Sequence, residues 1–268
     1  MCFGNLAVVT SVSERADASH SEYQSLLVAG SPFRISTCII PKNMSIVLTN
    51  IFCYIYMNLV GRTNDTVTSM RADSCSFRNQ FGYFKQISRI FHGDPWTHFV
   101  LVREPAERFL SGFTFVCDSE SYYAKFCEDC VGDVKCALRT AFEYSQRRAV
   151  GDFNADSYLF WHLSPQNWRC ELRDNLDNSK LVHYSSNKKD KLVNDIRELL
   201  SDANVHDSDI DVITSQIANG TTGHATNHLP QREEYSKQMQ NDEFKRLLVK
   251  VYFWDYILFN FPLPDVEI

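Results

Sequence analysis

A cation and a hydroxyl flank the start of one expected helix, in the stretch FVLVREPAERFLS at residues 99–111. Residues 99–102 are apolar and predict a short buried strand that ends at Arg103, and Pro105 suits the first turn of a following helix. A helix N-terminus presents unpaired backbone N–H groups and a partial positive charge. Arg103 lies beside such an end, and Ser111 lies two turns into the helix. This arrangement predicts an anion-binding site.

A second strand, turn and helix comes earlier in the chain and places a lysine in its turn. Residues 33–40, FRISTCII, predict a central strand, and apolar residues recur every three or four positions after Met44, which predicts a helix. Lys42 and Ser45 lie between the two elements. Backbone amides and a full positive charge would meet there, as in a phosphate-binding loop.

Both stretches resemble the sulfotransferases that use 3′-phosphoadenosine 5′-phosphosulfate (PAPS). The pattern R-x-P-x-x-R-x-x-S resembles the 3′-phosphate motif of that superfamily, in which Arg103 and Ser111 match the binding positions. Residues 41–45 resemble the 5′-phosphosulfate motif, except that Met44 stands where a glycine is common. The donor-binding residues that the resemblance implies are Lys42, Asn43, Met44, Ser45, Arg103 and Ser111.

A third segment supplies a candidate base. Residues 156–170, DSYLFWHLSPQNWRC, are aromatic and without a clean period, so we expect a loop. The segment resembles the H-W-x-P segment of carbohydrate sulfotransferases that act on chondroitin, dermatan and related glycans, with His162, Pro165 and Cys170 matching. Lys42 and His162 are then the implied catalytic residues, because lysine neutralises the leaving oxygen and a neutral imidazole accepts the proton of a sugar hydroxyl. The alternative for His162 is a packing role in an aromatic loop.

The resemblance runs from about residue 33 to residue 264 and includes the closing segment 251–264, VYFWDYILFNFPLP. It implies a divergent carbohydrate sulfotransferase of the chondroitin 4-O-sulfotransferase type. The implied fold is α/β, a P-loop kinase-like three-layer sandwich with a mainly parallel central sheet and helices on both faces. We expect residues 1–31 to be a poorly ordered lead-in and residues 32–268 to form one sulfotransferase domain.

The implied activity is transfer of a sulfo group from PAPS to a hydroxyl of a glycan. The acceptor would be a chondroitin-like glycosaminoglycan or an N- or O-linked oligosaccharide, and no metal is expected because lysine and arginine supply the charge. A catalytically inactive glycan-binding protein on the same fold is an alternative. A P-loop kinase is a further one, although the chain lacks G-x-x-x-x-G-K-[ST].

Charge and composition restrict the class of protein. The net charge is −6 and no basic stripe with interleaved aromatic residues occurs, so nucleic acid is not an expected partner. A local basic cleft formed by Lys42, Arg103 and Arg108 remains compatible with this charge. No run of about 20 apolar residues predicts a membrane span. Neither a signal peptide nor a membrane anchor is evident in the sequence. A location in the Golgi lumen or the secretory pathway is therefore an expectation that rests on the resemblance alone.

The sequence leaves open whether its nine cysteines form disulfides, bind a metal or stay reduced. Four of them lie close together, at positions 117, 127, 130 and 136, and could form disulfides, hold zinc or stay reduced. Three glycosylation sequons begin at Asn43, Asn64 and Asn219. We expect the one at Asn43 to stay unused, because a glycan there would fill the nucleotide pocket.

Overall fold

The computed structural model describes residues 26–28, 31–61, 75, 79–152, 154–185, 188–219 and 229–266. The chain divides into two compact units. The described residues of the first unit, here the sheet unit, lie in segments 26–103 and 169–219, and those of the second, here the helical unit, lie in segments 104–168 and 229–266. The chain therefore leaves the sheet unit after Arg103 and returns to it at Arg169.

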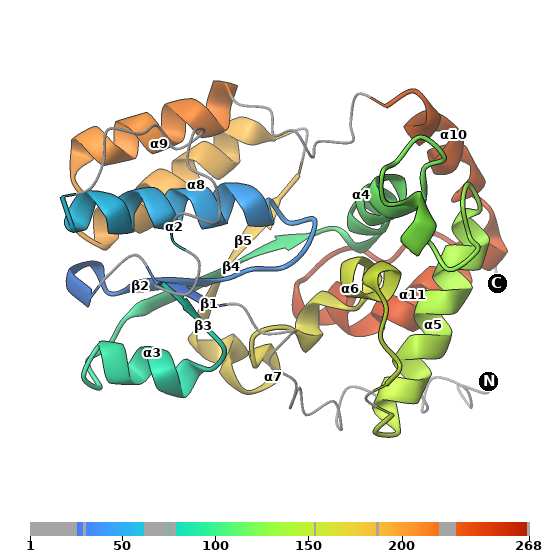
Figure 1. Ribbon diagram of the computed structural model, residues 1–268, viewed down its shortest axis with the longest axis horizontal. Helices are drawn as coiled ribbons and strands as arrows, with labels where there is room; N and C mark the ends of the chain where they lie inside the picture. Colours follow the sequence, from blue (N-terminus) through green and yellow to red (C-terminus); the bar gives the residue numbers. More distant parts are fainter. Residues whose placement is uncertain are drawn as a thin grey trace. The chain divides into compact units, whose positions relative to one another are not determined.

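The sheet unit is built on a mixed sheet with the strand order β3-β1-β2-β4-β5 (Figure 1). The strands are β1 (Leu26–Val28), β2 (Ile35–Cys38), β3 (Gln80–Phe81), β4 (Thr97–Arg103) and β5 (Ser179–Tyr184). β2, β4 and β5 run parallel, whereas β1 is antiparallel to both of its neighbours. The expectation of an α/β fold with a central sheet is confirmed.

β1 lies inside the stretch that we expected to be a peripheral lead-in. Its three residues are apolar and at most 2% exposed, and it pairs with β2 and β3. A strand of three residues is too short to show a period of its own, so only pairing with its neighbours reveals it. The boundary drawn at residues 31 and 32 therefore cuts through the sheet at this point.

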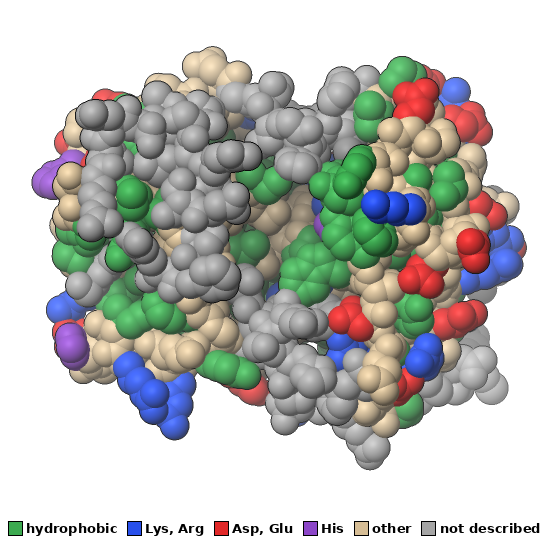
Figure 2. All heavy atoms as spheres, viewed as in Figure 1, with side chains coloured by type: hydrophobic (Ala, Val, Ile, Leu, Met, Phe, Trp, Pro, Cys, Tyr) green, Lys and Arg blue, Asp and Glu red, His purple; other side chains and the backbone are tan. Residues whose placement is uncertain are grey.

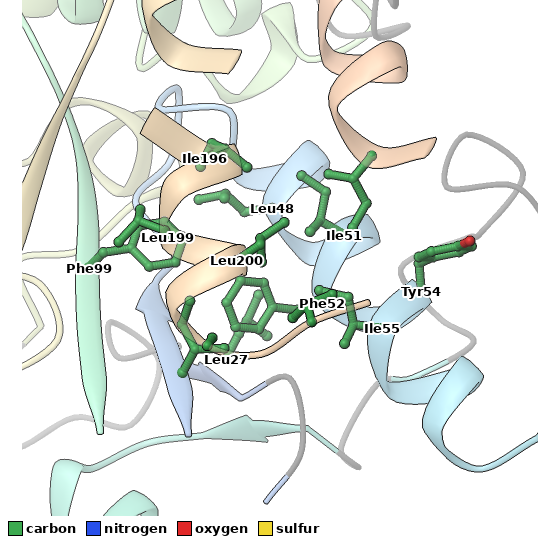
Figure 3. Packing of buried hydrophobic residues seen from close by; sticks show 14 of the residues in the cluster. Leu27, Leu48, Ile51, Phe52, Tyr54, Ile55, Phe99, Ile196, Leu199 and Leu200 are labelled. Carbon is green, nitrogen blue, oxygen red and sulfur yellow. The ribbon is translucent and has the colours of Figure 1, made fainter. Parts of the chain in front are cut away.

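Helices cover both faces of the sheet (Figure 1). α2 (Ser45–Leu59), α8 (Lys189–Asp202) and α9 (Asp207–Asn219) cover one face, and α3 (Phe84–Ile90) and α7 (Leu172–Asn175) lie on the other. Figure 3 shows Leu48 and Phe52 of α2 and Leu200 of α8 packed together in the core. Phe52 also meets Phe99 of β4, with 6.0 Å between the ring centroids. Burial of these apolar side chains supplies most of the driving force for packing the helices on the sheet.

The helical unit contains α4 (Pro105–Cys117), α5 (Val134–Ala149), α6 (Tyr158–Leu163), α10 (Gln231–Gln238) and α11 (Asp242–Leu258). Short 3-10 turns complete both units: Ser31–Phe33, Ala124–Phe126, Gln166–Trp168 and Leu176–Asn178. The single long helix that the apolar pattern after Arg232 suggests is interrupted, because Asn241 caps a new helix through the N–H groups of Glu243 and Phe244. Every helix in the described part of the chain is too short or too polar to cross a bilayer.

Four disulfides join eight of the nine cysteines. Cys38–Cys170 and Cys53–Cys75 lie in the sheet unit, and Cys117–Cys127 and Cys130–Cys136 lie in the helical unit. The four clustered cysteines are therefore used in disulfides, which overturns the zinc alternative because no thiolates are left to bind the metal. Cys2 and the sequon asparagine Asn64 lie outside the described residues, and Asn219 is exposed at the end of α9.

Candidate active site

The turn between β2 and α2 has the backbone shape of an anion-binding loop. Lys42 and Met44 both adopt left-handed conformations, with φ of 70° and 57°. Met44 is the residue before α2, and no side chain caps the helix there. The first N–H groups of a helix without a side-chain cap are suited to bind an anion. Met44 takes a left-handed backbone conformation that glycine adopts most easily, and glycine is the residue that the resemblance leads one to expect at this position.

Asn43 fastens this turn to the neighbouring strand. It is fully buried, its backbone N–H donates to the carbonyl of Ile40 at 3.1 Å, and its Nδ2 donates to the carbonyl of Leu101 at 2.8 Å. Nδ2 is also the atom to which a glycan would be attached. In the folded protein this sequon is inaccessible, in agreement with the expectation that it stays unused.

Arg103 ends β4 and bonds directly to the lysine turn. Its side chain is almost fully buried, Nη1 donates to the carbonyl of Lys42 at 3.1 Å, and the guanidinium lies 5.1 Å from the centre of the Tyr184 ring. Parallel β2 and β4 end at the same edge of the sheet, which is where α/β folds bind ligands. The structure thus brings together the two turns that the sequence indicated.

The N-terminus of α4 does not provide the backbone amides that we expected to bind an anion. The Glu104 carboxylate already accepts from Ala106 N at 3.0 Å and from Glu107 N at 2.6 Å. It also accepts from the Tyr256 hydroxyl at 3.1 Å. A second anion would be repelled by this carboxylate, so that part of the expectation is wrong. Arg103 and Ser111, the two residues that the resemblance assigns to the 3′-phosphate, belong to different units.

Ser111 lies in the helical unit, on the second turn of α4, and is 7% exposed. Arg108, on the same helix, is 1% exposed and does not face solvent. It donates to the carbonyls of His162 at 3.2 Å and of Ser164 at 2.9 Å. Of the three cations that could form a local basic cleft, Arg108 instead holds the segment that carries His162.

His162 lies on α6 and is 8% exposed, against the rings of Phe115 and Tyr158 at centroid distances of 5.2 and 4.6 Å. Its Nδ1 lies 2.9 Å from the carbonyl oxygen of Tyr158. A carbonyl can only accept a hydrogen bond, so this contact places the proton of the neutral imidazole on Nδ1. Nε2 then carries the lone pair, which is the state that a general base requires.

Side chains from α11 hold the segment after His162. The Tyr252 hydroxyl donates to the carbonyl of Leu163 at 2.5 Å, and the Asp255 carboxylate accepts from Gln166 N at 2.8 Å and from Asn167 N at 2.9 Å. Burial raises the pKa of Asp255 to about 6, although these N–H groups and Arg108 act in the opposite direction. Arg108 and α11 together bond to five backbone groups in the segment at residues 162–167.

From the sequence we predicted no positioning role for Tyr252 and Asp255, although the closing segment that contains them is part of the family resemblance. A signal is nevertheless present, since Asp255 interrupts the apolar run VYFWDYILF at residues 251–259, three positions after Tyr252. Buried polar residues of this kind need partners, which predicts that they serve another segment. Among the described residues, no group of three or more His, Cys, Asp and Glu side chains is placed to hold a metal ion.

A family model described as the sulfotransferase family matches residues 24–262. The chain belongs to the sulfotransferase family. Similar proteins of Caenorhabditis elegans include an uncharacterized protein, 23% identical over 242 residues that cover 87% of this sulfotransferase and 68% of the relative. Another is carbohydrate sulfotransferase chst-1, 27% identical over 242 residues that cover 85% and 73% of the two chains. No solved structure matches this sulfotransferase.

Proposed function

We propose that this sulfotransferase transfers a sulfo group from PAPS to a hydroxyl of a glycan. The observation that carries the proposal is the 3.1 Å hydrogen bond from Arg103 Nη1 to the carbonyl of Lys42. PAPS carries phosphate groups at its 3′ and 5′ positions, and two neighbouring motif cations at one sheet edge suit such a ligand. The family match runs from residue 24 to residue 262 and spans segments of both units, which supports one sulfotransferase domain over residues 32–268 that also includes β1.

The donor would be held by its two anionic ends. The N-terminus of α2, with Lys42 and the hydroxyl of Ser45, would bind the 5′-phosphosulfate, where Asn43 and Met44 set the shape of the turn. Arg103 and Ser111 would bind the 3′-phosphate. Each hydrogen bond to a charged group contributes about 1.5–3 kcal/mol, so the loss of one such residue is measurable.

The reaction exchanges one S–O bond for another. The acceptor hydroxyl oxygen attacks sulfur, the bond from sulfur to the bridging oxygen of the 5′-phosphate breaks, and adenosine 3′,5′-bisphosphate leaves. His162 Nε2 would take the hydroxyl proton, and Lys42 would neutralise the charge that develops on the departing oxygen. As in phosphoryl transfer, positioning and charge stabilisation do most of the work.

The acceptor and the compartment follow from chemistry and similarity. A relative carries the name carbohydrate sulfotransferase, and the segment around His162 resembles that of enzymes acting on chondroitin, so a chondroitin-like glycosaminoglycan is the acceptor that we propose. Four disulfides favour an oxidising compartment, which supports the lumen of the secretory pathway or the Golgi.

A thermal-shift comparison tests the proposal. Adenosine 3′,5′-bisphosphate at 100 times its Kd should stabilise the protein by about 2.7 kcal/mol, whereas ATP with Mg²⁺ should not. Arg103→Ala should reduce the stabilisation at the same nucleotide concentration to about 0.4–1.4 kcal/mol. Arg34→Ala, which alters an exposed arginine paired with Asp94, should keep the full stabilisation. A shift with ATP and Mg²⁺ alone would favour a kinase, and no shift with either nucleotide would favour an inactive glycan-binding protein.

A further inference from the structure

Exposed aromatic rings gather on the connection between α4 and α5. Tyr122 is 77% exposed and Phe126 is 42% exposed. The disulfides Cys117–Cys127 and Cys130–Cys136 close this connection into short loops and hold it against the helices. In Figure 2, hydrophobic side chains lie beside a Lys or Arg side chain in this part of the helical unit. Large aromatic side chains left in water on a rigid support often mark a ligand site.

These rings form a continuous series that ends at His162. Tyr122 meets Tyr123 at a centroid distance of 5.3 Å and an angle of 89°, and Tyr123 stacks on Tyr158 at 5.3 Å and 18°. Tyr158 then meets His162 at 4.6 Å, and Phe126 packs on Tyr158 at 5.2 Å. We call Tyr122, Tyr123, Phe126 and Tyr158 the aromatic platform. It leads from open solvent to the candidate base within one unit.

Packing explains only the inner part of the platform. Burial and the neighbouring Tyr123 raise the pKa of Tyr158 to about 12, as expected for a half-buried tyrosine. Tyr122 and Phe126 gain no comparable burial. Instead, the ammonium of Lys125 lies 4.9 Å from the ring centre of Tyr122 and 5.0 Å from that of Phe126. A cation over two exposed rings holds their orientation and adds positive charge at the rim.

We propose that the aromatic platform binds pyranose rings of the acceptor glycan that lie beyond the sugar being modified. The C–H faces of a pyranose are apolar and slightly positive, and they complement the negative faces of aromatic rings. Rigid tyrosine rings also lose little conformational entropy on binding. The proposal rests on the proposed function, because it assumes that the sugar hydroxyl reacts at His162.

This arrangement predicts a dependence on acceptor length. Three successive ring contacts link Tyr122 to His162. The proposal therefore assigns Tyr122 to a sugar beyond the reach of a disaccharide whose hydroxyl reacts at His162. Tyr122→Ala should therefore raise KM for a desulfated chondroitin octasaccharide about threefold to tenfold, as the loss of one aromatic stacking contact implies, and leave KM for the disaccharide unchanged. Turnover number and affinity for adenosine 3′,5′-bisphosphate should not change.

Matched variants and a second readout separate this proposal from the proposed function. Tyr122→Phe should keep the wild-type KM because it keeps the ring, and Ile257→Ala, at an exposed position of α11, should have no effect. An unchanged octasaccharide KM in active Tyr122→Ala would overturn the platform. If the wild type neither binds the nucleotide nor transfers sulfate, the proposed function fails. Saturation-transfer NMR with the octasaccharide then supports the platform if Tyr122→Ala weakens the signal relative to Tyr122→Phe, and an equal signal from the two variants overturns it.

Discussion

The substitution Asp255→Asn tests how α11 holds the segment that carries His162. Asp255 is fully buried, and burial raises its pKa from 3.8 to about 6. Between these two pH values the folded protein keeps a proton that the unfolded chain has released. The free energy of unfolding contributed by this group therefore falls as pH rises from about 4 to about 6, and stays at the lower level above.

The size of the effect follows from the shift. Each pKa unit corresponds to about 1.4 kcal/mol, so complete ionisation of Asp255 lowers the free energy of unfolding by about 3 kcal/mol. About 2.4 kcal/mol of this change falls between pH 4 and pH 7, because the unfolded carboxyl is already partly ionised at pH 4. Asparagine has no carboxyl proton to lose, so the difference in unfolding free energy between the variant and the wild type should move by about 2.4 kcal/mol in favour of the variant over this range. Effects that do not depend on pH, such as altered bonding to Gln166 N, cancel in this comparison.

Urea unfolding of both proteins at pH 4, 5, 6 and 7 measures this difference. Arg108 stays protonated throughout, and burial raises the pKa of Tyr252 still further from this range, so neither neighbour contributes. Tyr252→Phe is the control, because it removes the bond to the Leu163 carbonyl without removing a carboxyl group, and its difference from the wild type should be constant. A flat profile for Asp255→Asn, or one of opposite sign, would refute the assignment of a buried, ionising carboxyl.

Three other substitutions probe the site. Arg103→Ala should weaken binding of adenosine 3′,5′-bisphosphate about 10- to 100-fold, as measured by calorimetry, because one or more charged hydrogen bonds are lost. Equal affinity of the variant and the wild type would show that Arg103 does not bind the 3′-phosphate. His162→Ala should lower kcat by about 10² to 10⁴ in a sulfo-transfer assay with nucleotide affinity unchanged, whereas full turnover would place the base elsewhere. Met44→Val should lower the free energy of unfolding by about 1–2 kcal/mol in thermal unfolding, because a branched side chain tolerates φ of 57° poorly, and Met44→Gly should not. Equal stability of these two variants would contradict the cost assigned to the left-handed turn.

The sequence is sufficient to predict that the turns carrying Lys42 and Arg103 lie close together. Each residue follows an apolar strand and precedes a helix, and parallel strands in such units end at one edge of the sheet. In the structure, Arg103 Nη1 lies 3.1 Å from the backbone carbonyl oxygen of Lys42. The role of Met44 could not be predicted in the same way, because only the backbone angles reveal that methionine occupies a conformation typical of glycine.

Other features depend on contacts between residues distant in the chain. Arg108 looks like a surface cation in a helix pattern, and only packing against the segment at residues 162–164, more than fifty positions later, shows that it is buried. Glu104 illustrates a signal that was present and overlooked. An acidic residue immediately before a helix-starting proline is suited to cap that helix, and its carboxylate then excludes another anion.

The bond between Cys38 and Cys170 closes a covalent ring of chain that encloses Lys42, Arg103, Ser111 and His162. A protease that nicks the backbone once, anywhere inside this ring, cannot release a fragment carrying any of these residues. The cut molecule would migrate as one species on a denaturing gel until a reductant separates the pieces. Loss of activity after such a nick would therefore report displaced geometry and never the departure of a site residue.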